Sequence, residues 1–165
     1  MKKIPKKNYI YLLIIFILTI SFAFGFKKLY GSYKNYLLSI PEVRGVINEL
    51  NTKELLSYYN ESTNNIFYFS DSSKLESRDL EKEVSKYIKK KEYQEKTIYI
   101  NLKDASDEDY EVINKIFKVN IKNMTPCFIY TSEQEVKEVI LSKERVLTIE
   151  EIKTFFEKTL AKNEK

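Results

Sequence analysis

An uninterrupted apolar run near the N-terminus places the strongest constraint on how this chain can fold. Residues Tyr9–Phe26 read YIYLLIIFILTISFAFGF, and none of these positions carries a charge. A helix over this run would extend roughly 27 Å at about 1.5 Å per residue, close to the ~30 Å hydrocarbon core of a bilayer. Lysines bracket the run and aromatic residues lie near both ends, as at a membrane interface. The run therefore predicts a single transmembrane helix at residues 9–26.

A cleaved signal peptide is the alternative to this anchor, because Ala23-Phe24-Gly25 loosely matches a small-x-small cleavage site. The run is longer than the usual hydrophobic region of such peptides, and aromatic side chains crowd the site, which favours a retained signal-anchor. Four lysines precede the run, and Lys27 and Lys28 follow it closely. The positive-inside rule then places residues 1–8 in the cytoplasm. Both alternatives place the rest of the chain outside the cytoplasm, at the cell membrane if the anchor is retained.

The charge distribution agrees with this topology and argues against a nucleic-acid partner. The chain has 165 residues and a formal net charge of +4, but residues 1–28 contain six lysines and no acid. Removing those six charges from +4 leaves −2 for the other 137 residues. A nucleic-acid-binding domain would concentrate basic charge on its folded part. We therefore expect no nucleic-acid partner.

Composition excludes several classes of enzyme. The absence of histidine excludes Ser-His-Asp and Cys-His nucleophile pairs and histidine-ligated metal sites. A single cysteine, Cys127, excludes an internal disulfide, a CxxC pair and a thiolate-rich zinc site. The acidic stretch at residues 104–111 lacks the D-x-D-x-D-G spacing of a calcium loop and fits a helix N-terminus that favours acids. We predict no cofactor and no metal site.

Residues 27–42 are predicted to form a stalk, and residues 43–165 an extracytoplasmic domain. Tyr30, Tyr33 and Tyr36 follow one another at a spacing of three residues and can continue the helix through the headgroup region. Pro41 then provides a natural stop.

The domain alternates short apolar strands with amphipathic helices. Strands are predicted at residues 46–50, 66–69, 97–102, 127–130 and 136–141. Helices are predicted at residues 51–59, 73–91, 106–117 and 148–160, with Asn51, Ser73, Ser106 and Thr148 as their capping residues. This alternation, which ends in a hairpin, predicts an α/β sandwich around a mixed sheet.

This order, with Thr125-Pro126 immediately before the penultimate strand, resembles the thioredoxin fold. FYFSDSSKLES contains a buried strand, a short loop and a helix start where the redox site of that family lies. FKVNIKNMTPCFIYT resembles the stretch around the family's cis-proline loop. The resemblance covers residues 44–162 and implies a three-layer α/β sandwich with a mixed sheet. A membrane-anchored bacterial member of this kind resembles the small thioredoxin-like proteins that accompany bacteriocin export.

The family's catalytic motif is missing. When the loop is aligned as in the family, the two cysteines of CxxC fall on Lys74 and Ser77, and neither side chain can form a mixed disulfide. The resemblance thus implies the fold without its dithiol chemistry. Cys127, directly after Pro126, is the only candidate for thiol chemistry, although a lone buried cysteine usually packs as a small hydrophobe. A further departure is the lack of glycine in the final hairpin turn, residues 132–134.

The leading hypothesis is a membrane-tethered, redox-inactive thioredoxin-like binding module on the cell exterior, an accessory protein to secretion or peptide export. A groove between residues 72–77 and Thr125–Pro126 would hold a protein or peptide partner. One alternative is a monothiol oxidoreductase acting through Cys127. Another is a structural subunit of a membrane complex, in which residues 9–26 would be the binding element.

Overall fold

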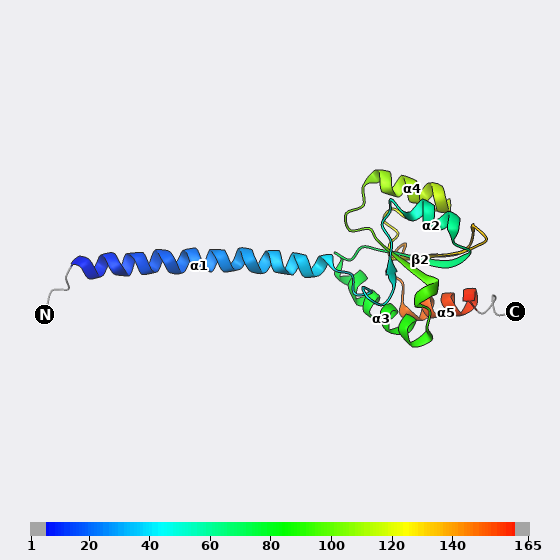
Figure 1. The fold of residues 1–165 in the computed structure, drawn as a ribbon. Helices are drawn as coiled ribbons and strands as arrows, with labels where there is room; N and C mark the ends of the chain where they lie inside the picture. Colours follow the sequence, from blue (N-terminus) through cyan, green and yellow to red (C-terminus); the bar gives the residue numbers. More distant parts are fainter. Residues whose placement is uncertain (1–5, 161–165) are drawn as a thin grey trace. The chain divides into compact units, whose positions relative to one another are not determined.

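The computed structural model describes residues 6–160, and the chain divides into two units, one up to Leu37 and one from Leu38 onward. The helix α1 (Lys6–Ser39) makes up the first unit, and its last residues belong to the second (Figure 1). By length and composition α1 could cross a membrane, and the side chains of its apolar window are exposed. It runs without a break through residues 9–26 and most of the predicted stalk, and ends just before Pro41.

The second unit is built on a five-stranded sheet with the order β1-β3-β2-β4-β5. Its strands are β1 (Asn48–Glu49), β2 (Asn64–Ser70), β3 (Thr97–Asn101), β4 (Cys127–Ser132) and β5 (Glu135–Leu141). β1, β3 and β2 run parallel, whereas β4 is antiparallel to both β2 and β5. The predicted mixed sheet and its terminal hairpin are therefore confirmed. β1 is shorter than predicted, since it is an edge strand whose side chains are exposed.

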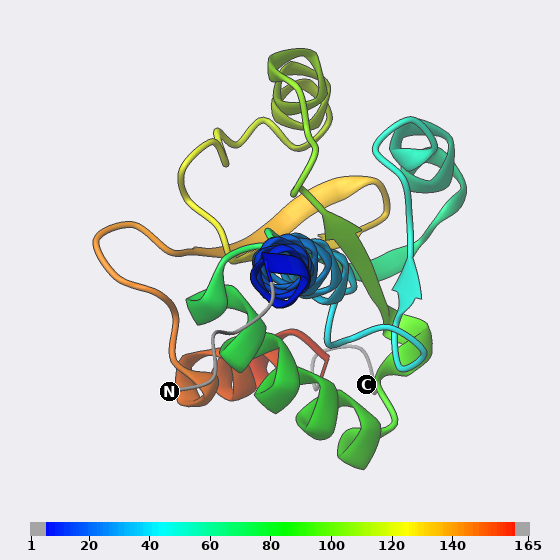
Figure 2. The same ribbon diagram turned by 90° about the vertical axis from the view of Figure 1, so that its left-hand side faces the viewer.

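Helices cover both faces of the sheet, which gives the three predicted layers (Figure 2). The helices are α2 (Leu55–Glu61), α3 (Leu75–Lys91), α4 (Asp107–Phe117) and α5 (Ile149–Leu160), with a 3₁₀ turn η1 (Gln94–Lys96) before β3. α3 and α5 pack on one face, and α2 and α4 on the other.

The central strand β2 fills both cores, because it is apolar on both of its faces. Tyr68 points to the α3/α5 side, where its ring stacks on that of Phe128 with centroids 4.2 Å apart. Phe67 and Phe69 point to the α2/α4 side and pack edge-on against Phe117. A continuous apolar run is what a strand buried on both faces requires.

Two of the four predicted helix caps are confirmed. The Ser106 hydroxyl accepts a hydrogen bond from the Asp109 amide at 3.2 Å, and the Asp109 carboxylate accepts one from the Ser106 amide at 2.8 Å. Thr148 and Glu151 exchange the same pair of bonds at the start of α5. Each pair satisfies amides that have no partner within the helix.

The other two predicted caps are wrong, because neighbouring polar groups bind the capping side chains differently. The Ser73 hydroxyl donates to the Asp71 carboxylate at 2.6 Å, and α3 starts only at Leu75. The Asn51 amide oxygen accepts from a backbone amide two residues on, in a turn, and α2 starts only at Leu55. Asx turns of this kind compete with helix capping.

Candidate functional site

The two segments that contain the predicted site residues lie at the same end of the sheet. In the β2–β4 ladder Phe69 is the register partner of Cys127, so the loop after β2 and Thr125–Pro126 before β4 lie at the same end of these strands. The Thr125–Pro126 peptide bond is cis. Pro126 is buried and its carbonyl oxygen accepts bonds from the amide and hydroxyl of Ser142. Among the described residues, no hydrogen bond uses the backbone N–H or C=O of Thr125.

The two positions that resemble the missing cysteines differ in exposure. Lys74 is the N-cap residue of α3, in extended conformation and without a side-chain cap, and its side chain is 58% exposed. Its ammonium lies 3.5 Å from the Asp71 carboxylate, which offsets the unfavourable position of a cation at a helix N-terminus. Ser77 is buried within the first turn of the helix. Neither residue can act as a thiol.

The loop before α3 is held in place by its own polar groups and by β3. Ser72 is fully buried; its hydroxyl accepts a hydrogen bond from the Asn101 side-chain amide at 3.0 Å. The amide oxygen of Asn101 in turn accepts from the Lys103 backbone amide at 3.1 Å. Next to this ordered loop, Leu75 is 69% exposed on the first turn of α3. This end of the sheet thus presents an exposed apolar side chain, Leu75, next to a loop that is held by hydrogen bonds.

Cys127 is fully buried in β4 and belongs to the apolar cluster between the sheet and the α2/α4 layer. Burial raises the pKa of its thiol well above the ordinary value. Thiol reactivity requires the thiolate and access to it. The Cys127 side chain meets neither requirement in this fold.

Glu81 is a central residue of this region that sequence reasoning missed. Its carboxylate is fully buried and accepts hydrogen bonds from the Tyr99 hydroxyl at 2.7 Å, the Ser70 hydroxyl at 2.8 Å and the Glu42 amide at 3.0 Å. A signal was available, because Glu81 lies three residues before Val84 on the apolar stripe of α3. A charged residue on such a stripe indicates a buried polar network.

Arg78 attaches the segment that enters the globular unit, residues 38–43, to the same helix. Its guanidinium donates to the Ile40 carbonyl at 2.8 Å and forms an ion pair with Glu42. A longer bond reaches the Ser72 carbonyl at 3.4 Å. This entry segment, which includes the end of the predicted stalk, therefore packs beside the loop that precedes α3.

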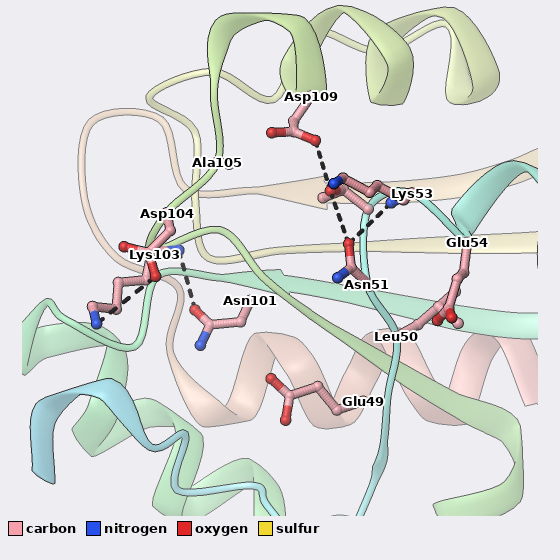
Figure 3. A pocket seen from close by; sticks show the side chains of 11 residues that line it. Glu49, Leu50, Asn51, Lys53, Glu54, Asn101, Lys103, Asp104, Ala105 and Asp109 are labelled. Atoms are coloured by element: carbon pink, nitrogen blue, oxygen red, sulfur yellow. Dashed lines mark hydrogen bonds and ion pairs between the residues drawn. The ribbon is translucent and has the colours of Figure 1, made fainter. Parts of the chain in front are cut away.

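The acidic stretch at residues 104–111 borders an open pocket of about 660 Å³ at the carboxyl ends of β1 and β3 (Figure 3). Asp109 accepts a hydrogen bond from the Thr52 hydroxyl at 2.6 Å in addition to its capping bonds, and these bonds lower the pKa of its carboxyl group. Within residues 6–160, no three acids or cysteines come together as a metal-binding group. Asp109 serves helix capping here.

No protein-family model and no curated protein matches the sequence. Solved structures do match. Thioredoxin O2 from Arabidopsis thaliana in the oxidized state is 16% identical over 70% of this chain and 95% of its own, with a TM-score of 0.50. Thioredoxin f2 from Chlamydomonas reinhardtii is 9% identical over 68% and 94%, also with a TM-score of 0.50. A third structure, described as having a thioredoxin fold, is 14% identical over 74% and 97%, with a TM-score of 0.51.

Identities this low carry information on the fold alone. The globular unit of this chain has the thioredoxin fold, and its sequence contains no CxxC pair.

Proposed function

We propose that this chain is a membrane-tethered, redox-inactive binding module that holds a protein or peptide partner on the outer side of the cell membrane. The observation that carries the proposal is the side chain at the start of α3. A helix N-terminus stabilises a thiolate, but this position is occupied by Lys74. The only cysteine, Cys127, is buried in β4. The scaffold is retained without the sulfur atoms that would make it an oxidoreductase.

Two features at the same end of the sheet support binding of an extended peptide. The backbone groups of Thr125 are available for pairing with a partner strand, the mode in which main-chain hydrogen bonds supply affinity. The exposed Leu75 side chain offers an apolar contact on the first turn of α3, the helix that follows β2. Lys74 and Glu76 flank Leu75 with opposite charges. We infer a partner segment that is extended and mainly apolar.

The tether and its direction rest on α1. Its apolar run, its length and the lysines before it support a signal-anchor with residues 1–8 in the cytoplasm. The role in secretion or peptide export rests only on the resemblance to thioredoxin-like accessory proteins. Alkaline carbonate extraction and external protease treatment of intact cells test the tether. A cleaved signal peptide would instead release a mature chain that begins near residue 26.

Site-specific photo-crosslinking tests the binding proposal. A photoreactive amino acid in place of Leu75 should capture a protein or peptide in native membranes. The matched control is the same replacement at Leu56, a leucine on α2 that is also exposed, at 52%. Equal capture at both positions, or none at Leu75, would contradict the proposed site. Reduction of insulin disulfides by the purified full chain above a protein-free blank would contradict the redox-inactive part.

A further inference from the structure

One face of α1 carries exposed apolar and aromatic side chains beyond the predicted span. Leu29, Tyr33 and Tyr36 are spaced by four and three residues and lie within about 60° of one another around a helix of 3.6 residues per turn. Tyr30 and Leu37 widen this face on one side. All five side chains are exposed in the structure. We call these five residues the stalk face.

The lipid headgroups cannot cover the whole stalk face. α1 has no break between Lys6 and Ser39, so the helix cannot turn into the membrane plane after the span. Tyr36 lies about 15 Å along the axis beyond Phe26, at about 1.5 Å per residue. The headgroup layer adds only ~5–8 Å on each side of the hydrocarbon core. The far end of the stalk face therefore stands in water, where exposed apolar surface marks an interaction site.

The spacing of the stalk face fits pairing with another helix. Phe26, Leu29, Tyr33 and Tyr36 follow intervals of three, four and three residues, which are successive a and d positions of a heptad. In this assignment Tyr30 and Leu37 are e positions beside the seam. A seam with this period is the pattern of a left-handed coiled coil.

The charges of the segment favour a second copy of the chain as the partner. Lys27 and Lys34 fall at b positions and Lys28 at c, on the outer side of the helix. The g positions within the stalk are serines, Ser32 and Ser39. Two copies can therefore meet without bringing like charges together. The positive-inside rule gives every copy the same orientation in the membrane, and the identical apolar run places every copy at the same depth. Identical heptad positions of two copies therefore lie opposite each other.

We propose that the stalk face pairs with the stalk face of a second copy, in a parallel, in-register coiled coil just outside the membrane. The pairing is separate from the proposed binding site on α3, so either proposal can fail without the other. It would present two binding modules side by side on one membrane. A partner with two segments would then gain affinity through effective concentration.

Cysteine scanning of residues 28–37 tests this pairing in the full chain with Cys127→Ala, in native membranes under mild oxidation. We expect disulfide-linked dimers to peak at Leu29→Cys, Tyr33→Cys and Tyr36→Cys and to be several-fold weaker at Lys28→Cys and Lys34→Cys. A profile without this period, the absence of dimers, or cross-links from the same positions to another protein would overturn the proposal.

A second measurement leaves Cys127 in place. Two differently tagged copies of the full chain should co-purify from detergent, and Tyr33→Glu together with Tyr36→Glu should abolish this by placing like charges in the seam. Lys34→Glu, on the outer side, should leave co-purification unchanged. Retained co-purification in the double variant would also overturn the proposal.

Discussion

The Tyr99 hydroxyl donates a hydrogen bond to the Glu81 carboxylate at 2.7 Å inside the core of the globular unit. A carboxylate buried this deeply is tolerated only when hydrogen bonds replace its lost hydration. Ser70 and the Glu42 amide supply two more of them. The network thereby joins β2, β3, α3 and the entry segment at one point. It links the entry segment to β2, the strand that leads into the candidate site.

Removing the Tyr99 hydroxyl should destabilise the fold. Tyr99→Phe leaves the ring in place and deletes a bond to a buried carboxylate, which we expect to lower the free energy of unfolding by about 1.5–3 kcal/mol. The matched control is Tyr68→Phe, because the Tyr68 hydroxyl is equally buried and has no hydrogen-bond partner among the described residues. Urea unfolding in detergent micelles, followed by near-UV circular dichroism of the tyrosines, measures both. Equal losses would show that the bond to Glu81 contributes nothing specific.

The Arg78 side chain should hold the entry segment against α3. Arg78 and Glu42 are only 12% and 28% exposed at their side chains, so their ion pair is shielded from water more than a surface pair is. Arg78→Ala should speed amide hydrogen exchange at Ile40, Glu42 and Val43 and leave exchange in β4 and β5 unchanged. Lys82→Ala is the control, because Lys82 is 51% exposed and 4.0 Å from the same carboxylate. Unchanged exchange in Arg78→Ala would mean that Pro41 and Val43 hold the segment by packing alone.

Cys127 should react with a thiol reagent only when the domain opens. The side chain is fully buried and burial raises the pKa of the thiol, so both access and thiolate are lacking in the native state. Labelling at pH 8 should be slow in the native chain and rapid in urea. A native rate close to the unfolded rate would revive the monothiol alternative.

The sequence predicts the layers of this fold well because the apolar pattern determines them. The runs around Tyr68, Ile98 and Ile129 are apolar on both faces and form the three buried central strands. Helix starts are predicted less well. The Ser73 hydroxyl could cap the helix or bind Asp71, and the spacing of the residues does not show which of these two bonds forms. The candidate site was predicted by resemblance, whereas Glu81 was not, because its partners Ser70, Tyr99 and Glu42 come from distant parts of the chain.

Alkaline pH should unfold the domain through tyrosines that must stay neutral in the core. Burial, with smaller contributions from Glu157 and Tyr93, raises the pKa of Tyr87 from 10.0 to about 12. Between these pH values the unfolded chain releases the Tyr87 proton while the folded chain retains it, so the free energy of unfolding falls as pH rises. Tyr87→Phe should reduce this slope without a cost at pH 7, because its hydroxyl has no hydrogen-bond partner among the described residues. Denaturation series at pH 7, 10 and 11 measure the slope, and an identical slope in the variant would contradict the assignment.

The turn between β4 and β5 should be a site where one substitution stabilises the fold. Glu133 and Gln134 adopt φ of 53° and 60°, the left-handed region in which a Cβ is unfavourable. Type I′ hairpins normally place asparagine or glycine at these positions, so the β4–β5 ladder imposes a conformation that these residues do not prefer.

Glu133→Gly should therefore raise the free energy of unfolding by about 1 kcal/mol, since it removes the Cβ and keeps the backbone bond from the Glu133 amide to the Thr63 carbonyl. Glu133→Ala is the matched control, because it loses the same carboxylate but keeps the Cβ and should bring no gain. If both variants gain equally, the benefit comes from removing the charge near Glu135 and not from the backbone. A gain confined to glycine would show that the missing hairpin glycine costs this chain stability.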